Sequence, residues 1–292
     1  MRPTSFKNII GQDTVKKRLS ISIKAALARG EALGHTLLTG PPGLGKTTFA
    51  RAIANELDTD IQIANGANLR SIKSILPYIM RIKASHVLFI DEIHRCTELV
   101  QEFIYPVMED LRCDLGQDTQ MTIDVPSFTL IGATTNGGAL TTPLLDRFPI
   151  KCHLSLYSED DLVKLISQSA HAWKLQIAPS ALLTIAKTSR GTPRVANGRL
   201  SWVRDYATAH GHKTITTDVV TKAMNMEGIS PNGMDASDRK YLTVLTKHRI
   251  LGLSSLVSAT NLSEDTIVHT IEPFLMRLGK IRKTSKGRVL SG

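Results

Sequence analysis

The sequence predicts an α/β domain built on a parallel sheet, followed by an all-helical module and then by a module of helices and a basic hairpin. In the first half of the chain, short apolar runs alternate with helical stretches, the pattern of a parallel sheet covered by helices. After about residue 158 the strand-like runs stop and helical periodicity takes over. A polar stretch with Gly and Pro at residues 228–233 then indicates a linker. We therefore expect domains at residues 1–157, 158–230 and 231–292.

The first domain opens with a helix and continues with four strands. Residues 13–29 carry apolar side chains at helical spacing, among them Leu19 and Ile23, and Gly30 is placed to end the helix. The strands are expected at residues 36–39, 61–64, 87–90 and 129–133, each a mostly apolar run. Strands of this kind are buried on both faces, so helices should cover both sides of the sheet.

Residues 40–47, GPPGLGKT, fit the phosphate-binding pattern G-x-x-x-x-G-K-[ST]. In this pattern glycines let successive backbone N–H groups surround a polyphosphate, a lysine reaches the β- and γ-phosphates, and a hydroxyl binds Mg²⁺. A predicted strand precedes the loop and a predicted helix at 48–57 follows it, which places phosphates at a helix N-terminus. The alternative is a glycine-rich turn without a ligand. We predict that the chain binds a nucleoside triphosphate.

Two acids end the strand predicted at 87–90. Asp91 and Glu92 follow four apolar residues, 45 positions after Lys46. A carboxylate at this place can hold Mg²⁺ through water, and the adjacent glutamate can orient and polarise the attacking water. Glu92 beside Asp91 therefore predicts hydrolysis of the nucleotide and not binding alone.

Three further positions each have two interpretations. The strand at 129–133 leads to Thr134 and Thr135, which could contact the γ-phosphate or the attacking water but are more often turn residues. Arg147 taken alone is best interpreted as a surface arginine or an ion-pair partner. Arg194 opens a predicted helix, where a cation opposes the helix dipole, so an anion should compensate it. That anion is either a nucleotide phosphate or a nearby Asp or Glu.

The second half of the chain is mostly helical and ends in a hairpin. Helices are predicted at residues 160–172, 179–189, 194–210 and 216–226. Beyond the linker, helices at 237–247, 254–259 and 264–278 precede two short strands joined by a turn at 285–287. Three helices followed by a basic hairpin form the winged-helix arrangement, which is used mostly on DNA.

The composition is that of an ordinary globular protein with a basic surplus. The 292 residues are 42% hydrophobic and 21% charged, with a net charge of +10. From residue 235 onward, ten Lys/Arg against five Asp/Glu give a surplus of five, which favours a polyanionic partner. Because the sequence has no run of 18 apolar residues and no signal region, we expect a cytoplasmic protein with no membrane partner. The three cysteines lack disulfide or metal-site spacing and are expected to be small buried or semi-buried thiols.

Five segments together resemble the RuvB family of AAA+ motors, which drive branch migration of Holliday junctions in recombination and repair. They are the phosphate loop, LFIDEIHR at 88–95, YPVMED at 105–110, FTLIGATT at 128–135 and RGTPR at 190–194. The resemblance extends from RPTSFKNIIGQ at 2–12 to KGR at 286–288. It implies an AAA+ ATPase domain, a helical lid and a winged helix, with ATP and Mg²⁺ as ligands. It also implies a homo-oligomeric ring, expected to be a hexamer, that translocates on double-stranded DNA and acts on four-way junctions.

The resemblance further implies roles for individual residues of the nucleotide site. The positions implied to bind phosphates are Gly43, Gly45, Lys46, Thr47 and Thr48. Mg²⁺ would be held by Thr47 and Asp91, water would be activated by Glu92, and Thr135 would be the first sensor of the γ-phosphate. Arg194 would be the second sensor, in the lid, while Arg2, Tyr157 and residues 109–111 match positions near the nucleotide.

Two further sets of roles concern neighbouring molecules. Arg147 would be an arginine finger that reaches into the site of a neighbouring subunit, which makes activity depend on a ring. DNA contact is implied for the wing residues Lys283, Lys286 and Arg288. Such cations bind phosphates without reading sequence, which suits a translocating motor.

The chain departs from the family in three places. Residues 111–123, LRCDLGQDTQMTI, are shorter and have a polar tip where the family docks its junction-binding partner RuvA. This difference argues against the usual docking and leaves a divergent partner or self-sufficient loading as alternatives. The family's arginine two residues before the finger is Leu145 here, and the usual basic run after Arg194 becomes GRLSW at 198–202. The predicted ATPase centre itself is intact.

Two other functions stay open on the sequence alone. A clamp-loader or helicase-loader ATPase would share the ATPase centre, but such proteins usually end in an oligomerising helical collar and not in a basic hairpin. A nucleotide-switched DNA-binding adaptor with little hydrolysis would not need Glu92 and Arg147. The sequence therefore favours a DNA-translocating ATP hydrolase of the RuvB type.

Overall fold

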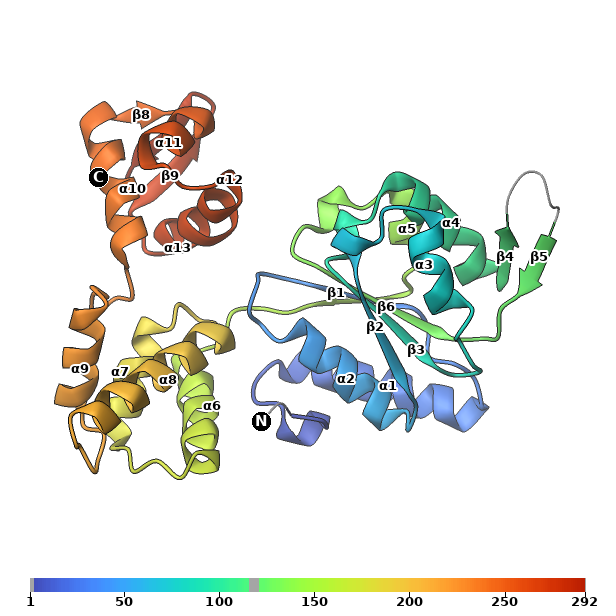
Figure 1. The fold of residues 1–292 in the computed structure, drawn as a ribbon, viewed down its shortest axis with the longest axis horizontal. Coiled ribbons are helices and arrows are strands. Elements are labelled where there is room, and N and C mark those ends of the chain that lie inside the picture. Colours follow the sequence, from blue (N-terminus) through green and yellow to red (C-terminus); the bar gives the residue numbers. More distant parts are fainter. Residues whose placement is uncertain (1–2, 116–120, 292) are drawn as a thin grey trace. The chain divides into compact units, whose positions relative to one another are not determined.

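The computed structural model describes residues 3–115 and 121–291, which fall into two compact units, Met1–Leu156 and Tyr157–Gly292 (Figure 1). The first unit is an α/β domain and the second combines a helical bundle with a smaller module of helices and strands. Among the described residues, none of the helices has the length and apolar character that a membrane crossing needs.

A five-stranded parallel sheet forms the centre of the first unit. Its order is β2-β3-β6-β1-β7, with bounds β1 Thr36–Thr39, β2 Ile61–Asn65, β3 Val87–Asp91, β6 Thr129–Thr134 and β7 Ile150–His153. Four of these strands are the predicted ones, so the parallel sheet is confirmed. The sequence does not predict β7, because its residues IKCH alternate in exposure as an edge strand does. Since β6 lies between β1 and β3, the ends of all three strands meet at one edge.

Helices cover both faces of this sheet, as expected. One face carries α1 (Asp13–Arg29) and α2 (Lys46–Glu56), and the other carries α3 (Ile72–Ile79), α4 (Glu98–Glu109) and α5 (Thr142–Asp146) (Figure 1). Buried residues such as Leu88, Ile104 and Val107 join the sheet to α4 in one apolar core. Helix α1 ends at Gly30, whose φ of 67° lets the chain turn away.

Short elements complete the first unit. The 3₁₀ turns are η1 (Phe6–Asn8), η2 (Gly66–Asn68), η3 (Ile93–Arg95) and η4 (Gly137–Ala139). An antiparallel hairpin of β4 (Arg112–Leu115) and β5 (Met121–Asp124) follows α4, with Cys113 paired to Ile123. The tip of this hairpin, where the sequence predicts a polar end, lies outside the described residues.

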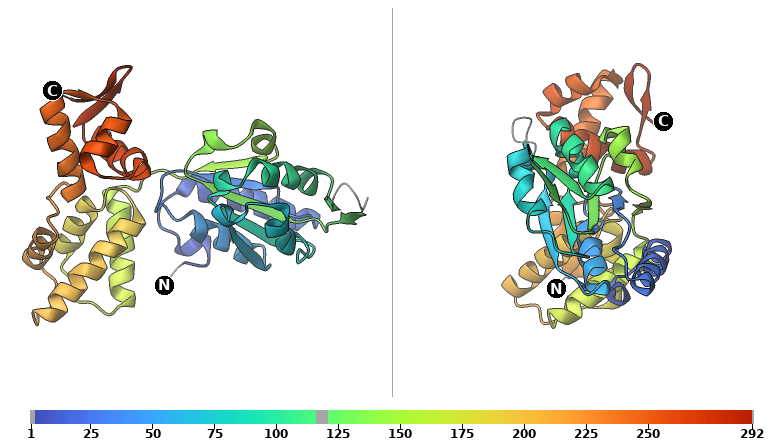
Figure 2. Two further views of the ribbon diagram at one scale, coloured as in Figure 1. Left: turned by 45° about the horizontal axis from the view of Figure 1, so that its top comes forward. Right: turned by 90° about the vertical axis from the view of Figure 1, so that its right-hand side faces the viewer.

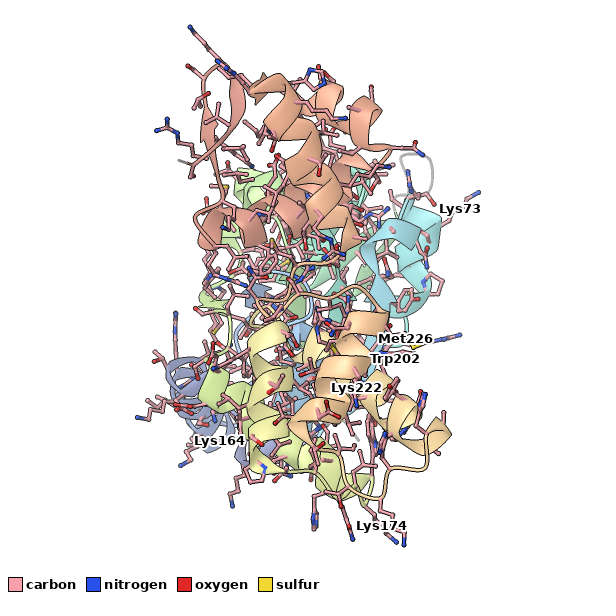
Figure 3. All side chains as sticks on the ribbon, turned by 90° about the vertical axis from the view of Figure 1, so that its left-hand side faces the viewer. Lys73, Lys164, Lys174, Trp202, Lys222 and Met226 are labelled. Carbon is pink, nitrogen blue, oxygen red and sulfur yellow. The ribbon has the colours of Figure 1, made fainter. Side chains whose placement is uncertain are left out.

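The second unit begins with four packed helices, each within one residue of its predicted bounds. They are α6 (Glu159–Ala172), α7 (Pro179–Thr188), α8 (Pro193–Ala209) and α9 (Thr217–Met226), around one apolar core. The indole N–H of Trp202 on α8 donates to the carbonyl of Ala223 on α9 at 2.8 Å, and Figure 3 shows Trp202 near Lys222 and Met226 of α9. Residues 228–233, predicted as a linker, form a hydrogen-bonded turn in which the Gly233 amide donates to the Ser230 carbonyl at 2.8 Å.

The last module is a winged helix, as predicted. Its helices are α10 (Ala236–His248), α11 (Leu253–Thr260), α12 (Glu264–Thr266) and α13 (Glu272–Arg277), and its antiparallel sheet has the order β8-β10-β9 with β8 Ile250–Leu251, β9 Ile281–Thr284 and β10 Gly287–Leu290. The hairpin β9–β10 (dark red) projects from the helices in Figure 2. The single helix predicted at 264–278 is interrupted by a π-helical segment, η5 (Ile267–Ile271). The physical reason is Pro273, which has no N–H to continue the helical hydrogen bonds.

Candidate functional site

The loop between β1 and α2 has turns that only glycine adopts without strain. Gly40, Gly43 and Gly45 have φ values of 135°, 82° and 96°. A Cβ atom on Gly40 would also lie 2.4 Å from the carbonyl oxygen of Leu154. The loop leads directly into α2, whose first turn has neither a side-chain cap nor an acidic residue. The N-terminal amides of α2 are therefore available to an anion from outside.

Lys46, the first residue of α2, is oriented within this loop. Its side chain is almost fully buried, and Nζ donates to the carbonyl oxygens of Gly40 at 2.8 Å and Pro41 at 3.2 Å. Thr47 and Thr48 follow it on α2 and are half-buried. A buried ammonium beside uncapped amides is a setting that a polyphosphate would complement.

Thr47 and Asp91 come from different elements and meet at the same edge of the sheet. The Thr47 hydroxyl donates to Asp91 Oδ2 at 3.1 Å, and the backbone N–H of Glu92 donates to Asp91 Oδ1 at 3.1 Å. A hydroxyl and a carboxylate in contact are hard oxygen ligands of the kind that Mg²⁺ prefers. Nowhere in the described parts of the chain do three or more His, Cys, Asp or Glu side chains form a metal site of their own. A metal at Thr47 and Asp91 would therefore be completed by oxygens of the nucleotide or of water.

Glu92 is held by side chains from its own turn and from the neighbouring strand. Its Oε2 accepts a hydrogen bond from the Thr135 hydroxyl at 3.2 Å and lies 3.3 Å from His94 Nδ1. The Thr134 hydroxyl lies 2.9 Å from the same ring nitrogen. The structure thus brings Thr47, Asp91, Glu92 and Thr135 together, while their catalytic roles stay predictions.

Two residues at this edge have no role in the sequence analysis. His94 contacts Glu92, and its signal is its place two residues after that acid. Gly66 follows β2, and a Cβ atom there would lie 2.3 Å from the carbonyl oxygen of Glu92 and 3.3 Å from that of Asp91. A glycine after a strand is visible in the sequence. Only the pairing of β2 with β3 shows that its missing side chain makes room for the Glu92 backbone.

Arg147 lies at the end of α5 and bonds to α4. Its Nη2 atom pairs with Glu109 Oε2 at 2.5 Å, and its guanidinium lies 5.9 Å from the centre of the Tyr105 ring. Its Nε atom is buried and has no partner among the described residues. About a third of the side chain is exposed, 34%. Of the two interpretations of Arg147, the ion pair is present in the single chain, and the finger role stays a prediction.

The predicted residues of the lid belong to the second unit. Arg194 is exposed on the first turn of α8, and the described residues offer it neither an ion pair nor a side-chain hydrogen bond. In the described part of the chain, no Asp or Glu therefore compensates the positive charge of Arg194 at this helix N-terminus. A nucleotide phosphate stays the predicted anion. The backbone N–H of Tyr157 donates to the Gly191 carbonyl at 2.9 Å, and its side chain packs against the lid core. Arg2 lies outside the described residues.

Two of the three predicted DNA-binding cations share a buried acid. Glu272 is fully buried at the start of α13, and its carboxylate pairs with Lys283 Nζ and Arg288 Nε, both at 2.7 Å. The Tyr241 hydroxyl adds a hydrogen bond at 3.2 Å. Burial alone would raise the pKa of Glu272, but the hydrogen bonds and charges of Arg288 and Lys283 outweigh it and hold that pKa below its usual value. Lys286, in the turn of the hairpin, is exposed.

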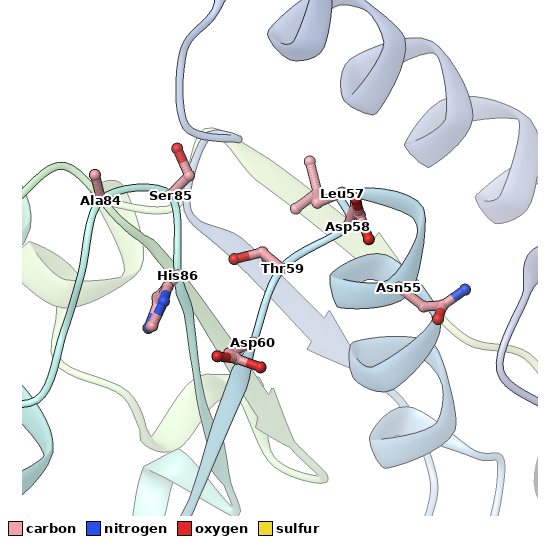
Figure 4. Close-up of a pocket in the computed structure, with 8 residues that line it drawn as sticks. All are labelled: Asn55, Leu57, Asp58, Thr59, Asp60, Ala84, Ser85 and His86. Carbon is pink, nitrogen blue, oxygen red and sulfur yellow. The ribbon is translucent and has the colours of Figure 1, made fainter.

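The opposite edge of the sheet has a depression that is unrelated to these residues. It measures about 440 Å³ and lies where β2 and β3 begin (Figure 4). It is lined by Asn55, Leu57, Asp58, Thr59, Asp60, Ala84, Ser85 and His86. Because the phosphate loop and the acids lie where their strands end, this depression is not part of the nucleotide site.

Models of three protein families match successive parts of the chain. The model of the Holliday junction DNA helicase RuvB P-loop domain matches residues 1–154, that of the RuvB AAA lid domain matches 157–230, and that of the RuvB C-terminal winged helix domain matches 231–292. Together they span nearly the whole sequence.

Curated relatives and a solved structure agree with the family models. The Holliday junction branch migration complex subunit RuvB of Rhodopirellula baltica is 42% identical, over 99% of this chain and 81% of its own length. The subunit of the same name from Prochlorococcus marinus is 41% identical, over 100% of this chain and 84% of its own length. The structure of the Thermotoga maritima RuvB Holliday junction branch migration motor is 40% identical and aligns with a TM-score of 0.91, over 99% of this chain and 95% of that one.

Proposed function

The chain belongs to the RuvB family of Holliday junction helicases, and we propose that it is an ATP hydrolase that drives branch migration of four-way DNA junctions. The observation that carries this proposal is the meeting of Thr135 with Glu92 beside the Thr47–Asp91 pair. A carboxylate that can accept a proton from water, a hydroxyl on the next strand and a phosphate loop then share one edge of the sheet. That set of groups is what nucleotide hydrolysis needs. The protein would act in the cytoplasm on double-stranded DNA.

The residues around the loop divide the work of hydrolysis. The amides of the loop and the Lys46 ammonium would bind the phosphates of ATP. Thr47 and Asp91 would hold Mg²⁺, which neutralises phosphate charge when it is bound. Glu92 would orient the attacking water and accept its proton, and Thr135 would keep that carboxylate in place and sense the γ-phosphate. Arg194, without an anionic partner in the described residues of its own unit, would bind phosphate from the lid.

We place the arginine finger at Arg147 and assign it to the site of a neighbouring subunit in a hexameric ring. In the single chain Arg147 bonds to Glu109 and not to Asp91 or Glu92 of its own nucleotide site, in the described residues. Both side chains of this pair are partly exposed, at 34% and 58%. Exposed pairs are weak, so the guanidinium can exchange Glu109 for a phosphate of a neighbour.

Mixing two inactive variants tests this arrangement. Glu92→Gln removes the proton acceptor and Arg147→Ala removes the finger, so each variant alone should lose hydrolysis. In rings assembled from equal amounts of the two variants, some interfaces pair an intact Glu92 of one subunit with an intact Arg147 of the next. These make up on the order of a quarter of the interfaces. Steady-state ATPase activity should therefore reappear in the mixture. No recovery, with ring assembly verified by sedimentation, would contradict a site shared between subunits.

A strand-exchange assay on a synthetic four-way junction tests the function itself. We expect ATP-dependent conversion of the junction into two duplexes, alone or with a RuvA-type partner. Hydrolysis of ATP without strand exchange in every condition would instead favour a loader or an adaptor.

The loading partner is a separate proposal. The sequence resemblance predicts that residues 111–123 are shorter and more polar at the tip than the family's docking hairpin, so we propose that the motor is loaded by a divergent partner or without one. Stimulation of strand exchange by an ordinary RuvA protein, to the degree that RuvA stimulates its own RuvB, would contradict this.

A further inference from the structure

The loop between α7 and α8 is partly buried and has an unusual backbone. Arg190 has a φ of 56°, which is rare for a residue with a side chain, and Gly191 follows with a φ of 77°. Ser189 is fully buried, and its hydroxyl donates to the Ile185 carbonyl at 2.5 Å. A left-handed residue with a long side chain persists only where surrounding contacts compensate for the strain.

The side chain of Arg190 supplies those contacts, and all of them lie outside the helical lid. Its Nη2 atom donates to Asp235 Oδ2 at 2.7 Å and to Asp238 Oδ2 at 2.6 Å, at the start of α10. Its Nε atom donates to the Gly233 carbonyl at 3.0 Å, and its guanidinium lies 4.3 Å from the centre of the Phe274 ring on α13. Only 9% of the side chain is exposed. Arg190 is therefore a lid residue whose guanidinium is built into the winged helix.

Contacts also run in the opposite direction. Arg277 on α13 donates through Nη2 to the backbone carbonyl of Arg190 at 2.8 Å. The turn at residues 228–233, between the two modules, also packs closely against the lid. A Cβ atom on Gly233 would lie 2.7 Å from the Thr188 carbonyl, and the buried Arg199 of α8 lies within 3.5 Å of the Gly233 carbonyl. The connection is a set of fixed contacts and not a loose tether.

The predicted nucleotide sensor lies directly after this loop. Arg194 lies four residues after Arg190, on the first turn of α8. Gly191, between them, accepts the hydrogen bond from the Tyr157 amide, where the second unit begins. When Arg194 responds to the nucleotide, the loop that precedes it should move as well. Arg190 would then transmit this movement to the winged helix.

We propose that Arg190 is a positioning residue that couples the nucleotide-sensing lid to the DNA-binding winged helix, so that the two modules move as one lever. The proposal rests on the proposed function of the chain as a DNA-translocating ATPase. Within the described part of the second unit, Arg190 touches neither Arg194 nor the wing hairpin. Its effect should therefore appear in the coupling between hydrolysis and DNA movement, and not in either one alone.

Substitution of Arg190 in the full chain tests this separation. Arg190→Met keeps a long apolar side chain over Phe274 and removes the donors to Asp235 and Asp238. Arg190→Lys keeps one cation and loses the planar fork. Arg204→Met is the matched control, because Arg204 lies on α8, stacks 4.8 Å over Trp173 and pairs with Asp205 inside the lid. For each variant we would measure ATPase activity with and without duplex DNA, DNA affinity with a slowly hydrolysed ATP analogue, and junctions migrated per ATP.

The expected result is a loss of coupling with its components preserved. Arg190→Met should keep DNA affinity and DNA-free ATPase within about twofold, while DNA stimulation and junctions migrated per ATP fall by about tenfold, a usual size for coupling between two sites. Arg190→Lys should lie between Arg190→Met and the wild type, and Arg204→Met should match the wild type.

Three results would overturn the coupling. The first is a wild-type number of junctions migrated per ATP in folded Arg190→Met protein. The second is a parallel loss of DNA affinity, which would mean that Arg190 only supports the fold of the winged helix. If Arg190→Met does not fold, the same measurements are made on Arg190→Lys. The third result is then an Arg190→Lys protein that migrates as many junctions per ATP as the wild type. Strand exchange absent from the wild type itself would instead overturn the proposed function, and DNA stimulation of the ATPase would still decide the role of Arg190.

Discussion

Gly66 offers the sharpest test of how the Glu92 backbone is placed. In the Gly66→Ala variant, the new Cβ atom would lie 2.3 Å from the Glu92 carbonyl oxygen, where at least 3.0 Å is needed. The backbone of Glu92 must then move by about 0.7 Å, the difference between the two distances. Misplacement of a catalytic group by about 1 Å can cost about a hundredfold in rate. We expect kcat to fall by roughly 30- to 100-fold, about 2–3 kcal/mol of transition-state stabilisation.

The assay must separate placement of Glu92 from loss of the nucleotide. Gly66 lies next to Glu92 and not next to Lys46, so the affinity for a fluorescent ATP analogue should change by less than about threefold while kcat falls. Gly198→Ala is a matched control, because Gly198 lies on helix α8 with nothing within 4 Å of its Cβ position. That substitution should leave kcat unchanged and stabilise the helix by about 0.5–1 kcal/mol.

Two outcomes would refute this reasoning about Gly66. A folded Gly66→Ala protein whose kcat lies within about threefold of the wild type would show that the Glu92 backbone tolerates the shift. An equal loss of kcat and nucleotide affinity would show that the whole site collapses, so that no separate effect on Glu92 remains.

Three further predictions concern the winged helix and the thiols. Glu272→Gln should destabilise the protein in urea or thermal unfolding by about 2–3 kcal/mol, less than a fully buried pair because Lys283 is 43% exposed. Since folding lowers the pKa of Glu272 below its usual value, this contribution is present at neutral pH and is lost as pH falls through the folded pKa. The difference between the two proteins should therefore shrink in acid. Lys286→Ala should weaken DNA binding equally for all sequences and reduce the slope of log affinity against log salt by about one, measured by fluorescence titration. A thiol-reactive dye should label the native protein slowly and all three cysteines after denaturation, because all three are buried and burial raises the pKa of Cys96 to about 12.

Much of the fold follows from local patterns in the sequence. The phosphate loop, the four predicted strands of the sheet and the helices of the lid have lengths and periodicities that neighbouring residues determine. The exceptions are short or depend on partners far away. Strand β7 alternates in exposure at a sheet edge, β8 has only two residues, and Pro273 changes the helical hydrogen bonding of η5 without removing the helix. Their formation depends on tertiary pairing and not on local preference.

The candidate site divides in the same way. Residues at or just after the end of a strand, such as Asp91 and Thr135, can be placed from the sequence, because parallel strands end at a common edge. The sequence cannot indicate which distant residues touch them. Gly66 meets Glu92 only because β2 pairs with β3, and Arg190 meets acids 45 and 48 positions further along. Each of these contacts depends on the order in which elements pack.

The partial neutralisation of the wing is consistent with a motor that must release DNA at each step. Lys283, Arg288 and Glu272 together carry one positive charge, although the first two are the predicted phosphate contacts. Each phosphate contact adds about 0.9 to the salt dependence of binding, so a cation held by an acid contributes less than a free one. Glu272 also fixes both cations on one face of the hairpin, where Lys283 and Arg288 are paired across the strands. Glu272 would thus hold the two cations in a fixed position and lower the affinity of the wing for DNA. A lower affinity suits repeated binding and release along a duplex.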